Sequence, residues 1–547
     1  MSSDQHQRTD AGRRSVVIAP TAMVATSQPL AVQVGIDILK RGGSAADAAI
    51  AVNAALGLVE PMSCGIGGDL FAIVWDANEE RLVGLNGSGR SPYGLTREVF
   101  AQKGLGRIPL RGPLSLSVPG CVDGWYTLHD RFGRLPLSDL LAPVIDYGEA
   151  GFPISPVIAS MWYQATDLLA GDQGAAATYL PGGHAPACGE IFRNPDLARV
   201  LRAIAEGGKQ AFYHRRIAEE IVAVSQKLGG FFTIEDFSDH TSTWVEPISV
   251  PYRGLDVWEL PPNTQGIAVL EMLRLLEGFD LGDLGHNSVE ALHLLIEAKK
   301  LAYEDRARFY ADPDFYDPPL DVLLSAAYAV KQRQRIDPNR AALEFPLEDP
   351  RLRGGDTVYL TVVDSDRNAV SLIQSLYHGF GSGIVPPGLG FALQNRGALF
   401  SLDPDHANTL EPHKRPFHTI IPAFVTKNGR PVFSFGVMGG DQQPQGQVQV
   451  LVNLIDFGMD VQQAGDAFRF SHDGSSTPTG DRMHDGGIVY LEPGIPDAIA
   501  EGLRQKGHHV EYRQGGYGGY QGIRIDPETD MLSGGSEPRK DGCAIGY

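Results

Sequence analysis

The sequence predicts a layered fold of the α/β or α+β class. Segments with the alternating or β-branched pattern of strands are collected in two blocks, and helical patterns precede and follow them. No internal repeat divides the chain, and no low-complexity tract is long enough to act as a linker. The 547 residues are sufficient for one large domain or for three smaller ones.

The N-terminal part alternates between strand and helix signals. Gly42-Gly43 ends a first helical pattern, and Ser44 is a good cap for the helix that follows. The many alanines of that second helix predict close packing against another element. The expected elements are a strand at residues 23–27, a helix through Val32–Leu39, a helix from Ala45, and strands at Leu70–Trp75 and Arg81–Asn86.

Helical and strand patterns also follow one another in the rest of the chain. The expected segments are a mainly helical region at 111–237, strands within 243–260, a long helix over Val289–Phe309, a β-rich block from Thr357 to about Val437, and a helix near Gln447–Phe457. Strand-like pieces near the C-terminus complete the second block of strands.

Composition argues against several classes of function. The 66 acidic and 46 basic side chains give a net charge of −20, which repels phosphate backbones, so no nucleic-acid partner is expected. The richest apolar stretch, Ala45–Val59, is interrupted by Asp47 and Asn53 and is too short for a membrane span. We therefore expect no membrane partner. Residues 16–19, after Arg13-Arg14, faintly resemble a signal peptide, but Pro20 interrupts the apolar run, so we expect a cytoplasmic location, with a periplasmic one as the weaker alternative.

The bond between Asp356 and Thr357 lies where a charged, glycine-containing segment, 349–355, runs into a strand-like run. We hypothesise that the chain cleaves itself there and that Thr357 becomes an N-terminal residue. A hydroxyl needs a base beside it to act as a nucleophile at neutral pH. A free α-amino group has a pKa of about 8 and can take that proton. An N-terminal threonine therefore carries nucleophile and base together, without metal or cofactor.

Signatures of competing chemistries are missing from the sequence. It contains no P-loop, G-x-G-x-x-G, H-E-x-x-H or G-x-S-x-G motif, and its four cysteines form no C-x-x-C pair. His293 and Glu297 have metal-ligand spacing on the predicted long helix, but no third ligand is evident and a polar helix face is favoured. The glycine-rich run 515–520 could cradle an anion, although a tight connection between strands is favoured. No metal and no cofactor are expected.

Short motifs spread over residues 22–547 carry a resemblance to a known family. They are Gly35–Ala49, Gly65–Gly68, Val118–Gly120, Pro261-Pro262 and Ala302–Arg306 in the first part, and Asp356-Thr357, Phe380–Ile384, Lys414–Pro416, Gly439-Gly440 and Glu537–Arg539 in the second. The set resembles the γ-glutamyltranspeptidases, which are N-terminal-nucleophile hydrolases.

The resemblance implies an α+β fold of the αββα type, in which two stacked, mainly antiparallel sheets lie between helical layers. It also implies a proenzyme that is cut into a large subunit, residues 1–356, and a small subunit, residues 357–547. The two subunits would stay associated as one catalytic unit. In the cut, Thr357 Oγ1 would attack the Asp356 carbonyl and form an ester, which water then hydrolyses.

The resemblance further implies roles for four other residues. Ser375 matches a threonine that hydrogen-bonds the nucleophile and its amine. Gly439 and Gly440 match the backbone donors of the oxyanion hole, where glycine lets a substrate approach the main chain closely. Arg90 matches an arginine that binds a substrate carboxylate, a role suited to a planar, bidentate donor. The alternatives without catalysis are a solvent-facing strand serine, a simple turn and a surface arginine.

The expected substrate contacts depart from the family pattern. Arg396 and Leu399 stand where the family has a glutamine and an aspartate that hold the α-amino group of the substrate. His418-Thr419 replace paired serines that contact the α-carboxylate. An acceptor for an ammonium is thus lost and positive charge is added, which favours an anionic amide without an α-amino group. This pattern resembles the branch that includes oxamate amidohydrolase and proteins labelled as cephalosporin acylases.

The predicted function is amide hydrolysis, or acyl transfer, by a self-processed N-terminal threonine enzyme. Its partner would be a small-molecule amide with an anionic acyl group, bound by Arg90 together with Arg396, His418 and Thr419. γ-Glutamyl amides such as glutathione are the family default, and small acidic amides of the oxamate or glutaryl/cephalosporin type are the rival. An inactive family member that acts as a binding protein is a further alternative, against which the intact Thr357 argues.

Overall fold

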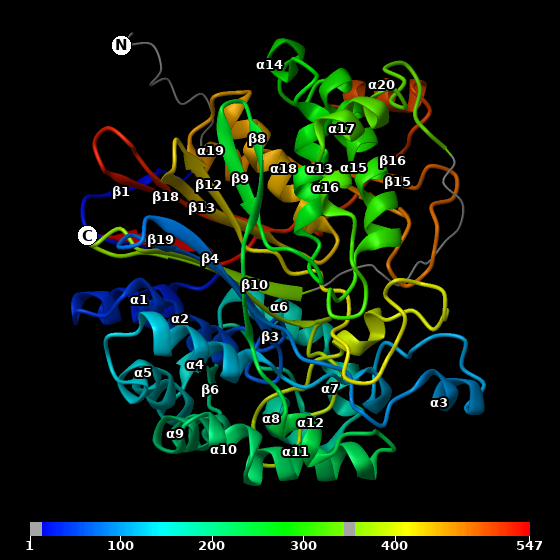
Figure 1. Ribbon diagram of the computed structural model, residues 1–547. Coiled ribbons are helices and arrows are strands. Elements are labelled where there is room, and N and C mark those ends of the chain that lie inside the picture. Colours follow the sequence, from blue (N-terminus) through cyan, green and yellow to red (C-terminus); the bar gives the residue numbers. More distant parts are fainter. Residues whose placement is uncertain (1–13, 344–355) are drawn as a thin grey trace.

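The computed structural model describes residues 14–343 and 356–547, and two antiparallel sheets lie face to face at its centre (Figure 1). The first sheet runs in the order β1 (Val17–Ala19), β18 (Leu532–Ser536), β17 (Gly519–Ile525), β13 (Arg430–Met438), β12 (Ala423–Lys427), β9 (Leu255–Glu259) and β8 (Ile248–Tyr252). The second runs in the order β19 (Cys543–Gly546), β2 (Met23–Thr26), β10 (Asp356–Val363), β11 (Ala369–Tyr377), β3 (Asp69–Asp76), β4 (Arg81–Gly87) and β7 (Thr243–Val245).

Side chains alternate across the strands of the second sheet and so fill two separate cores. Tyr359 of β10 and Ile373 of β11 face the other sheet and pack there with Phe424 of β12. Val358 and Leu372 point the opposite way, into the core beneath the first group of helices. The expected arrangement of two stacked sheets between helical layers is therefore present.

Helices cover both outer faces of the pair of sheets (Figure 1). On the second sheet lie α1 (Pro29–Lys40), α2 (Ala45–Val59), α4 (Cys121–Phe132), α5 (Leu137–Ala150), α6 (Pro156–Gln164), α7 (Thr166–Ala170), α8 (Gln173–Tyr179), α9 (Pro195–Gly207), α10 (Lys209–Tyr213), α11 (Arg216–Lys227) and α12 (Ile234–Ser238). On the first sheet lie α13 (Gly266–Leu276), α14 (Leu281–Leu284), α15 (Val289–Phe309), α16 (Leu320–Leu323), α18 (Gln442–Ile455), α19 (Val461–Asp466) and α20 (Asp497–Gln505).

The remaining elements are short or peripheral. They are α3 (Arg97–Gln102), α17 (Ala326–Arg333), the pair β5 (Phe152–Pro153) and β6 (Ile191–Phe192), a small sheet of β14 (Phe470–Asp473), β15 (Ile488–Leu491) and β16 (His509–Tyr512), and the 3₁₀ turns η1 (Pro113–Ser115), η2 (Pro181–Gly183) and η3 (Arg396–Leu399). The glycine-rich run 515–520 lies in the connection from β16 to β17, as expected, and its last two residues begin β17.

Two expected elements are present but differ in their bounds or continuity. The helix expected near Gln447–Phe457 begins earlier, at Gln442, and ends at Ile455. The β-rich block is interrupted, because no strand of either sheet lies between β11 and β12 in this part of the described chain. Phe380, Gly381 and Gly383, with φ of +56°, +57° and +80°, turn the chain away from the sheet directly after β11.

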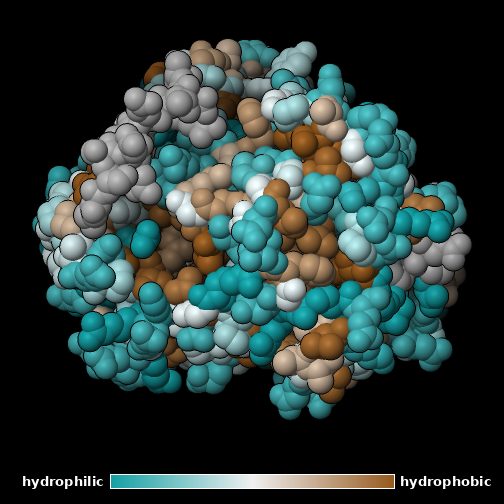
Figure 2. All heavy atoms as spheres, turned by 90° about the horizontal axis from the view of Figure 1, so that it is seen from above, coloured by the Kyte–Doolittle hydropathy of each residue, from teal (hydrophilic) through white to brown (hydrophobic). Residues whose placement is uncertain are grey.

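The face shown in Figure 2 is mainly hydrophilic, and apolar residues (brown) gather in its hollows and in smaller outer patches. Within residues 14–343 and 356–547, no helix combines the length and the apolar character that a membrane crossing requires.

Candidate active site

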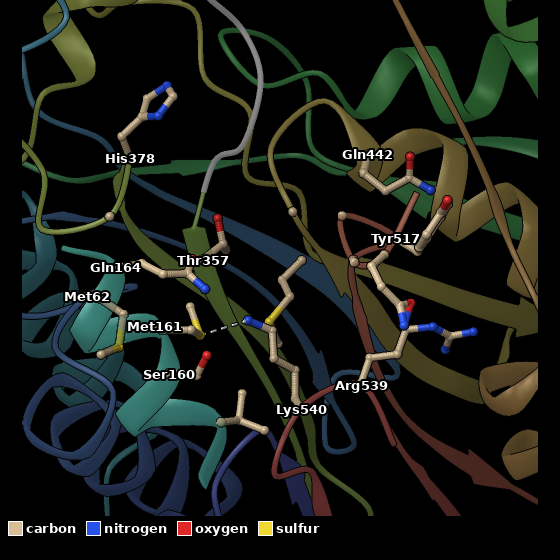
Figure 3. Close-up of a pocket in the computed structure, with 18 of the residues that line it drawn as sticks. Met62, Ser160, Met161, Gln164, Thr357, His378, Gln442, Tyr517, Arg539 and Lys540 are labelled. Atoms are coloured by element: carbon tan, nitrogen blue, oxygen red, sulfur yellow. Dashed lines mark hydrogen bonds between the residues drawn. The ribbon is translucent and has the colours of Figure 1, made fainter. Parts of the chain in front are cut away.

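Thr357, near the start of β10, lies at the wall of a large cavity between the two sheets and helix α6 (Figure 3). The cavity has a volume of about 1090 Å³, and the Thr357 side chain is only 2% exposed. The pairing of β10 with β11 shifts register between Asp356 and Val358, so Thr357 sits at an irregularity of the ladder. The expected cleavage segment 349–355 lies outside the described residues, and so does the Asp356 side chain.

The Thr357 hydroxyl has two side-chain partners. It donates to Ser375 Oγ at 3.3 Å, and the backbone N–H of Tyr377 donates to the same Ser375 oxygen at 2.8 Å. Gln443 Nε2 approaches Thr357 Oγ1 at 3.5 Å, while Gln443 Oε1 is held by the Ile421 N–H at 3.0 Å. Ser375 thus lies beside Thr357 as expected, and Gln443 is a neighbour that the sequence did not reveal.

Gly439 and Gly440 lie between β13 and α18, and Gly439 lines the cavity. Their φ angles of +123° and +59° suit glycine, and a Cβ at Gly439 would lie 3.1 Å from the Cα of Gly518. Their carbonyls accept hydrogen bonds from the N–H groups of Gln442 and Gln443, both at 3.1 Å. The start of α18 also adds a field that favours negative charge here. The backbone at this pair thus requires glycine, and its role as an oxyanion hole remains a prediction.

Arg306 of α15 fixes the loop that carries the glycine pair. Its Nη1 donates to Asp441 Oδ1 at 2.6 Å and to Gln265 Oε1 at 2.7 Å. Gln265 Nε2 in turn donates to the Gly440 carbonyl at 2.9 Å, and the Tyr303 hydroxyl donates to the Asp441 carbonyl. The sequence singled out Ala302–Arg306 as a motif but gave it no role, and these bonds explain it.

Three of the four residues predicted to contact the acyl group form a buried polar cluster around Asp69 of β3. His418 Nε2 lies 3.0 Å from Asp69 Oδ2, and Arg396 Nη1 donates to Thr419 Oγ1 at 2.8 Å. Asp69 is the register partner of Ser375 on the adjacent strand, so this cluster adjoins the nucleophile. The structure brings Arg396, His418 and Thr419 together, and each is at most 2% exposed. Asp69 was missed, although it directly follows the Gly67-Gly68 motif.

Burial controls the ionisation of this cluster. It raises the pKa of the Asp69 carboxyl to about 6, against the opposing pull of the Arg396 charge. It also lowers the pKa of Arg396 to about 10 and holds the pKa of His418 well below its usual value. At neutral pH the cluster therefore combines an anionic Asp69, a cationic Arg396 and a neutral His418.

Arg90 does not belong to the lining of the cavity. Its Nη2 is 3.7 Å from Asp314 Oδ2, and its Nη1 donates to the Thr241 carbonyl at 3.5 Å. Arg111 lines the cavity instead and donates to the Gly379 carbonyl at 2.8 Å. The role of Arg90 in substrate binding stays a prediction, and Arg111 is a cationic wall residue that sequence reasoning missed.

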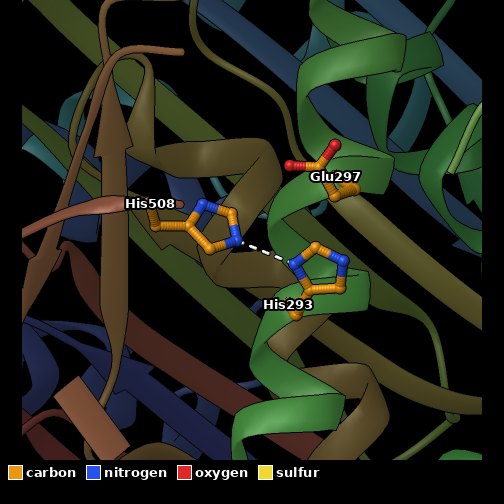
Figure 4. Close-up of side chains that lie close together, drawn as sticks. All are labelled: His293, Glu297 and His508. Carbon is orange, nitrogen blue, oxygen red and sulfur yellow. Dashed lines mark hydrogen bonds between the residues drawn. The ribbon is translucent and has the colours of Figure 1, made fainter. Parts of the chain in front are cut away.

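His293 and Glu297 lie close to a third possible metal ligand, His508, which is on the loop before β16 (Figure 4). The three offer ligand atoms within 4.8 Å of one another, which the sequence did not show. His293 Nδ1 is hydrogen-bonded to His508 Nε2 at 2.8 Å, and Glu297 forms an ion pair of 2.8 Å with the buried Lys300. Because an ammonium already neutralises Glu297, we assign the cluster a structural role rather than a metal-binding one.

The buried histidine pair should make the protein sensitive to acid. Burial lowers the pKa of His508 to about 2 and also lowers that of His293, whereas an unfolded histidine has a pKa of about 6.5. Their stabilising effect is therefore complete above pH 6.5 and lost as the pH falls below it. Below pH 6.5, each of the two histidines lowers the unfolding free energy by about 1.4 kcal/mol per pH unit.

When the pH falls from 7 to 5, we expect the unfolding free energy of His508→Gln to decrease by about 2 kcal/mol less than that of the wild type. Urea unfolding at both pH values measures this difference. His509→Gln removes the adjacent, exposed histidine and is the matched control. Equal pH dependence in His508→Gln and wild type would contradict the assignment.

Comparison with known proteins agrees with this architecture. The γ-glutamyltranspeptidase family model matches residues 31–547. The chain belongs to this family. It is similar to the glutathione hydrolase-like YwrD proenzyme of Bacillus subtilis, at 41% identity over 97% of this chain and 99% of the relative. It is also similar to the oxamate amidohydrolase proenzyme of Klebsiella pneumoniae, at 34% identity over 97% of this chain and 99% of that one.

Among solved structures, a cephalosporin acylase from Bacillus halodurans superposes on this γ-glutamyltranspeptidase-family chain with a TM-score of 0.91. The two are 44% identical, and the match covers 100% of this chain and 99% of the acylase. The αββα fold of an N-terminal-nucleophile hydrolase is thereby confirmed. The chain is an enzyme, an amide hydrolase of this family.

Proposed function

We propose that this γ-glutamyltranspeptidase-family protein is a self-processed amidohydrolase for small amides whose acidic acyl group lacks an α-ammonium. Cleavage of the Asp356–Thr357 bond yields subunits of residues 1–356 and 357–547. The freed Thr357 attacks the substrate carbonyl while its own α-amine takes the hydroxyl proton and passes it to the leaving amine. The Gly439 and Gly440 amides stabilise the oxyanion, and water hydrolyses the resulting ester.

The main support for an acidic acyl group is the buried guanidinium of Arg396. Its Nε and Nη2 have no hydrogen-bond partner in the described part of the chain, although the side chain is fully buried. Such donors are costly to bury without an acceptor, and a carboxylate would satisfy two of them at once. Leu399, where the family has an aspartate, is also buried and offers no acceptor for an ammonium.

The charges on the cavity wall support the same choice. Asp441 and Asp473 are the carboxylates of the lining in the described chain, and each is bonded to an arginine. Asp441 pairs with Arg306 at 2.6 Å, and Asp473 pairs with Arg513 at 2.7 Å. A substrate ammonium would therefore compete with an existing ion pair for either one.

Hydrolysis of γ-glutamyl amides such as glutathione is the second candidate. It is favoured by the similarity, at 41% identity, to a glutathione hydrolase-like protein. The first candidate is in turn favoured by similarity to an oxamate amidohydrolase and to a cephalosporin acylase. The two candidates share Thr357 chemistry and differ in one group on the substrate, the α-ammonium.

Two anilides that differ only in that group test the proposal. We expect glutaryl-4-nitroanilide to be hydrolysed with a kcat/KM at least about tenfold above that of γ-glutamyl-4-nitroanilide, because Leu399 offers the ammonium no acceptor and both oxygens of Asp69 already have hydrogen-bond partners in the protein. Release of 4-nitroaniline is followed by absorbance, with Thr357→Ala as the blank. A preference for the γ-glutamyl anilide would favour the second candidate, and no turnover of either would also require oxamate to be tested as a substrate.

A further inference from the structure

Gln443 is a buried glutamine whose side-chain amide ends beside the hydroxyl of Thr357. It lies in the first turn of α18, and its own backbone N–H donates to the Gly440 carbonyl at 3.1 Å. Its side-chain Nε2 lies 3.5 Å from Thr357 Oγ1, and no part of the residue is exposed. This distance is at the long end of hydrogen bonding, as is common for catalytic contacts before substrate binds.

The orientation of the Gln443 amide is fixed by its oxygen. Oε1 accepts the N–H of Ile421 at 3.0 Å, so the NH₂ end is the one that faces Thr357. A flipped amide would bring two donors, the Ile421 N–H and the amide NH₂, face to face. Within residues 14–343 and 356–547, Thr357 Oγ1 is the hydrogen-bond acceptor of Nε2. The amide is therefore a fixed donor that is directed at the nucleophile.

The Thr357 hydroxyl is thus held from two sides. It donates its hydrogen to Ser375 Oγ at 3.3 Å and accepts an N–H from Gln443. A hydroxyl oxygen has two lone pairs, so one of them stays free to attack a substrate carbonyl. Gln443 therefore contacts the reacting atom without blocking it.

The strength of this hydrogen bond must change during the reaction. A hydroxyl or alkoxide oxygen accepts a hydrogen bond well, whereas the alkoxy oxygen of an ester accepts poorly because its lone pair is delocalised into the carbonyl. The bond is therefore weak in the acyl-enzyme and strong when the ester breaks. An interaction accelerates a step only if it is stronger in the transition state than in the state before it. Gln443 meets this condition for breakdown of the acyl-enzyme, and not for acylation, which starts from the free hydroxyl.

We propose that Gln443 is a catalytic residue of deacylation, the step that frees Thr357. The inference rests on the proposed function and adds a donor for the oxygen that leaves. In this step water attacks the ester carbonyl and gives a proton to the Thr357 α-amine. The bond from the carbonyl carbon to Oγ1 then breaks, its electron pair stays on Oγ1, and the α-ammonium returns the proton to that oxygen as the acid departs. Gln443 Nε2 donates to Oγ1 while the negative charge develops there.

An ester with an activated leaving group isolates this step. With mono-4-nitrophenyl glutarate, a burst of 4-nitrophenolate should report acylation, and the steady rate that follows should report deacylation. Gln443→Met keeps the length of the side chain and lacks the donor. We expect it to lower the steady rate about tenfold and to change the burst rate less than about threefold. Stopped-flow absorbance measures both rates, and mass spectrometry should find the acyl group on the small subunit during the steady phase.

Gln447→Met is the matched control. Gln447 lies on the same helix, is equally buried and donates to the Ile421 carbonyl at 3.0 Å, but has no hydrogen bond to Thr357. Both of its rates should equal those of the wild type. Gln443→Glu keeps the shape and the acceptor for the Ile421 N–H without the donor, and should show the same selective fall even if Gln443→Met folds poorly. An unchanged steady rate, an equal fall of both rates, or the same fall in Gln447→Met would overturn the proposal.

Failure of the proposed substrate class would be seen separately. If the glutarate ester does not acylate the wild type, the preference for an acidic acyl group fails, and 4-nitrophenyl acetate, which needs no recognition of the acyl group, then tests Gln443. The acetyl group should persist on Thr357 about tenfold longer in Gln443→Met than in the wild type. Equal lifetimes, or a wild type that is not acetylated at Thr357, would overturn the role of Gln443 whichever acyl group the enzyme prefers.

Discussion

Thr357→Ala is expected to remain a single polypeptide of 59.0 kDa and to lose amide hydrolysis by at least about a thousandfold. The wild type should instead give two fragments, the smaller beginning at Thr357. Self-cleavage and turnover both need the Thr357 hydroxyl, which lies 3.3 Å from Ser375 Oγ, and alanine removes it from both reactions. Mass spectrometry of the purified proteins and anilide hydrolysis measure the two effects.

Thr361→Ala is the matched control for this variant. Thr361 lies on the same strand and bonds Ser434 Oγ at 2.6 Å inside the sandwich. Its loss should cost about 1 kcal/mol of stability without preventing cleavage. A cleaved or fully active Thr357→Ala protein would show that another residue is the nucleophile. Cleavage lost equally in Thr361→Ala would point to damage of the strand instead.

Local signals were sufficient to predict many elements of the fold. Helix α2 begins after Ser44, whose hydroxyl accepts the Asp47 N–H while the Asp47 carboxylate accepts the Ser44 N–H. Helix α15 spans Val289–Phe309 as predicted. Its signals are local, because Ser288 caps its first turn by accepting the Ala291 N–H. The layered arrangement itself followed mainly from the resemblance to a family, since periodicity alone left α/β and α+β open.

The start of α18 could not be predicted from hydrophobic periodicity. Its first turns carry glutamines that are buried although they are polar, because each bonds backbone outside the helix. Gln442 and Gln449 donate to the Phe470 carbonyl, and Gln447 donates to the Ile421 carbonyl. A pattern rule reads such residues as solvent-facing, and only the tertiary partners show why they belong to a helix.

The sequence predicted which residues form the candidate site better than it predicted which of their neighbours they contact. Thr357, Ser375 and the glycine pair lie together because β10, β11 and β13 are neighbours in two stacked sheets. Asp69 and Arg111 were missed because their importance depends on contacts with distant segments. Arg90, assigned by its motif, does not line the cavity, since its side chain turns toward Asp314.

Arg306→Met is expected to lower kcat about a hundredfold while KM changes little. The variant would remove the bonds from α15 to Asp441 and to Gln265, which fix the loop before α18 and the Gly440 carbonyl. An oxyanion hole that is less well fixed stabilises the transition state less, whereas the bound substrate loses little. Steady-state kinetics with the preferred anilide would measure both constants.

The same loop should serve self-cleavage, because the Asp356 carbonyl must pass through a similar tetrahedral state. We therefore expect Arg306→Met to accumulate uncut precursor, and Arg306→Lys to recover only part of the rate because lysine lacks the planar fork. Arg308→Met, which changes a side chain on the same helix that is 58% exposed, is the control and should behave as wild type. A fall in thermal stability with unchanged kcat in the folded Arg306→Met protein would mean that Arg306 supports the fold and not the oxyanion hole.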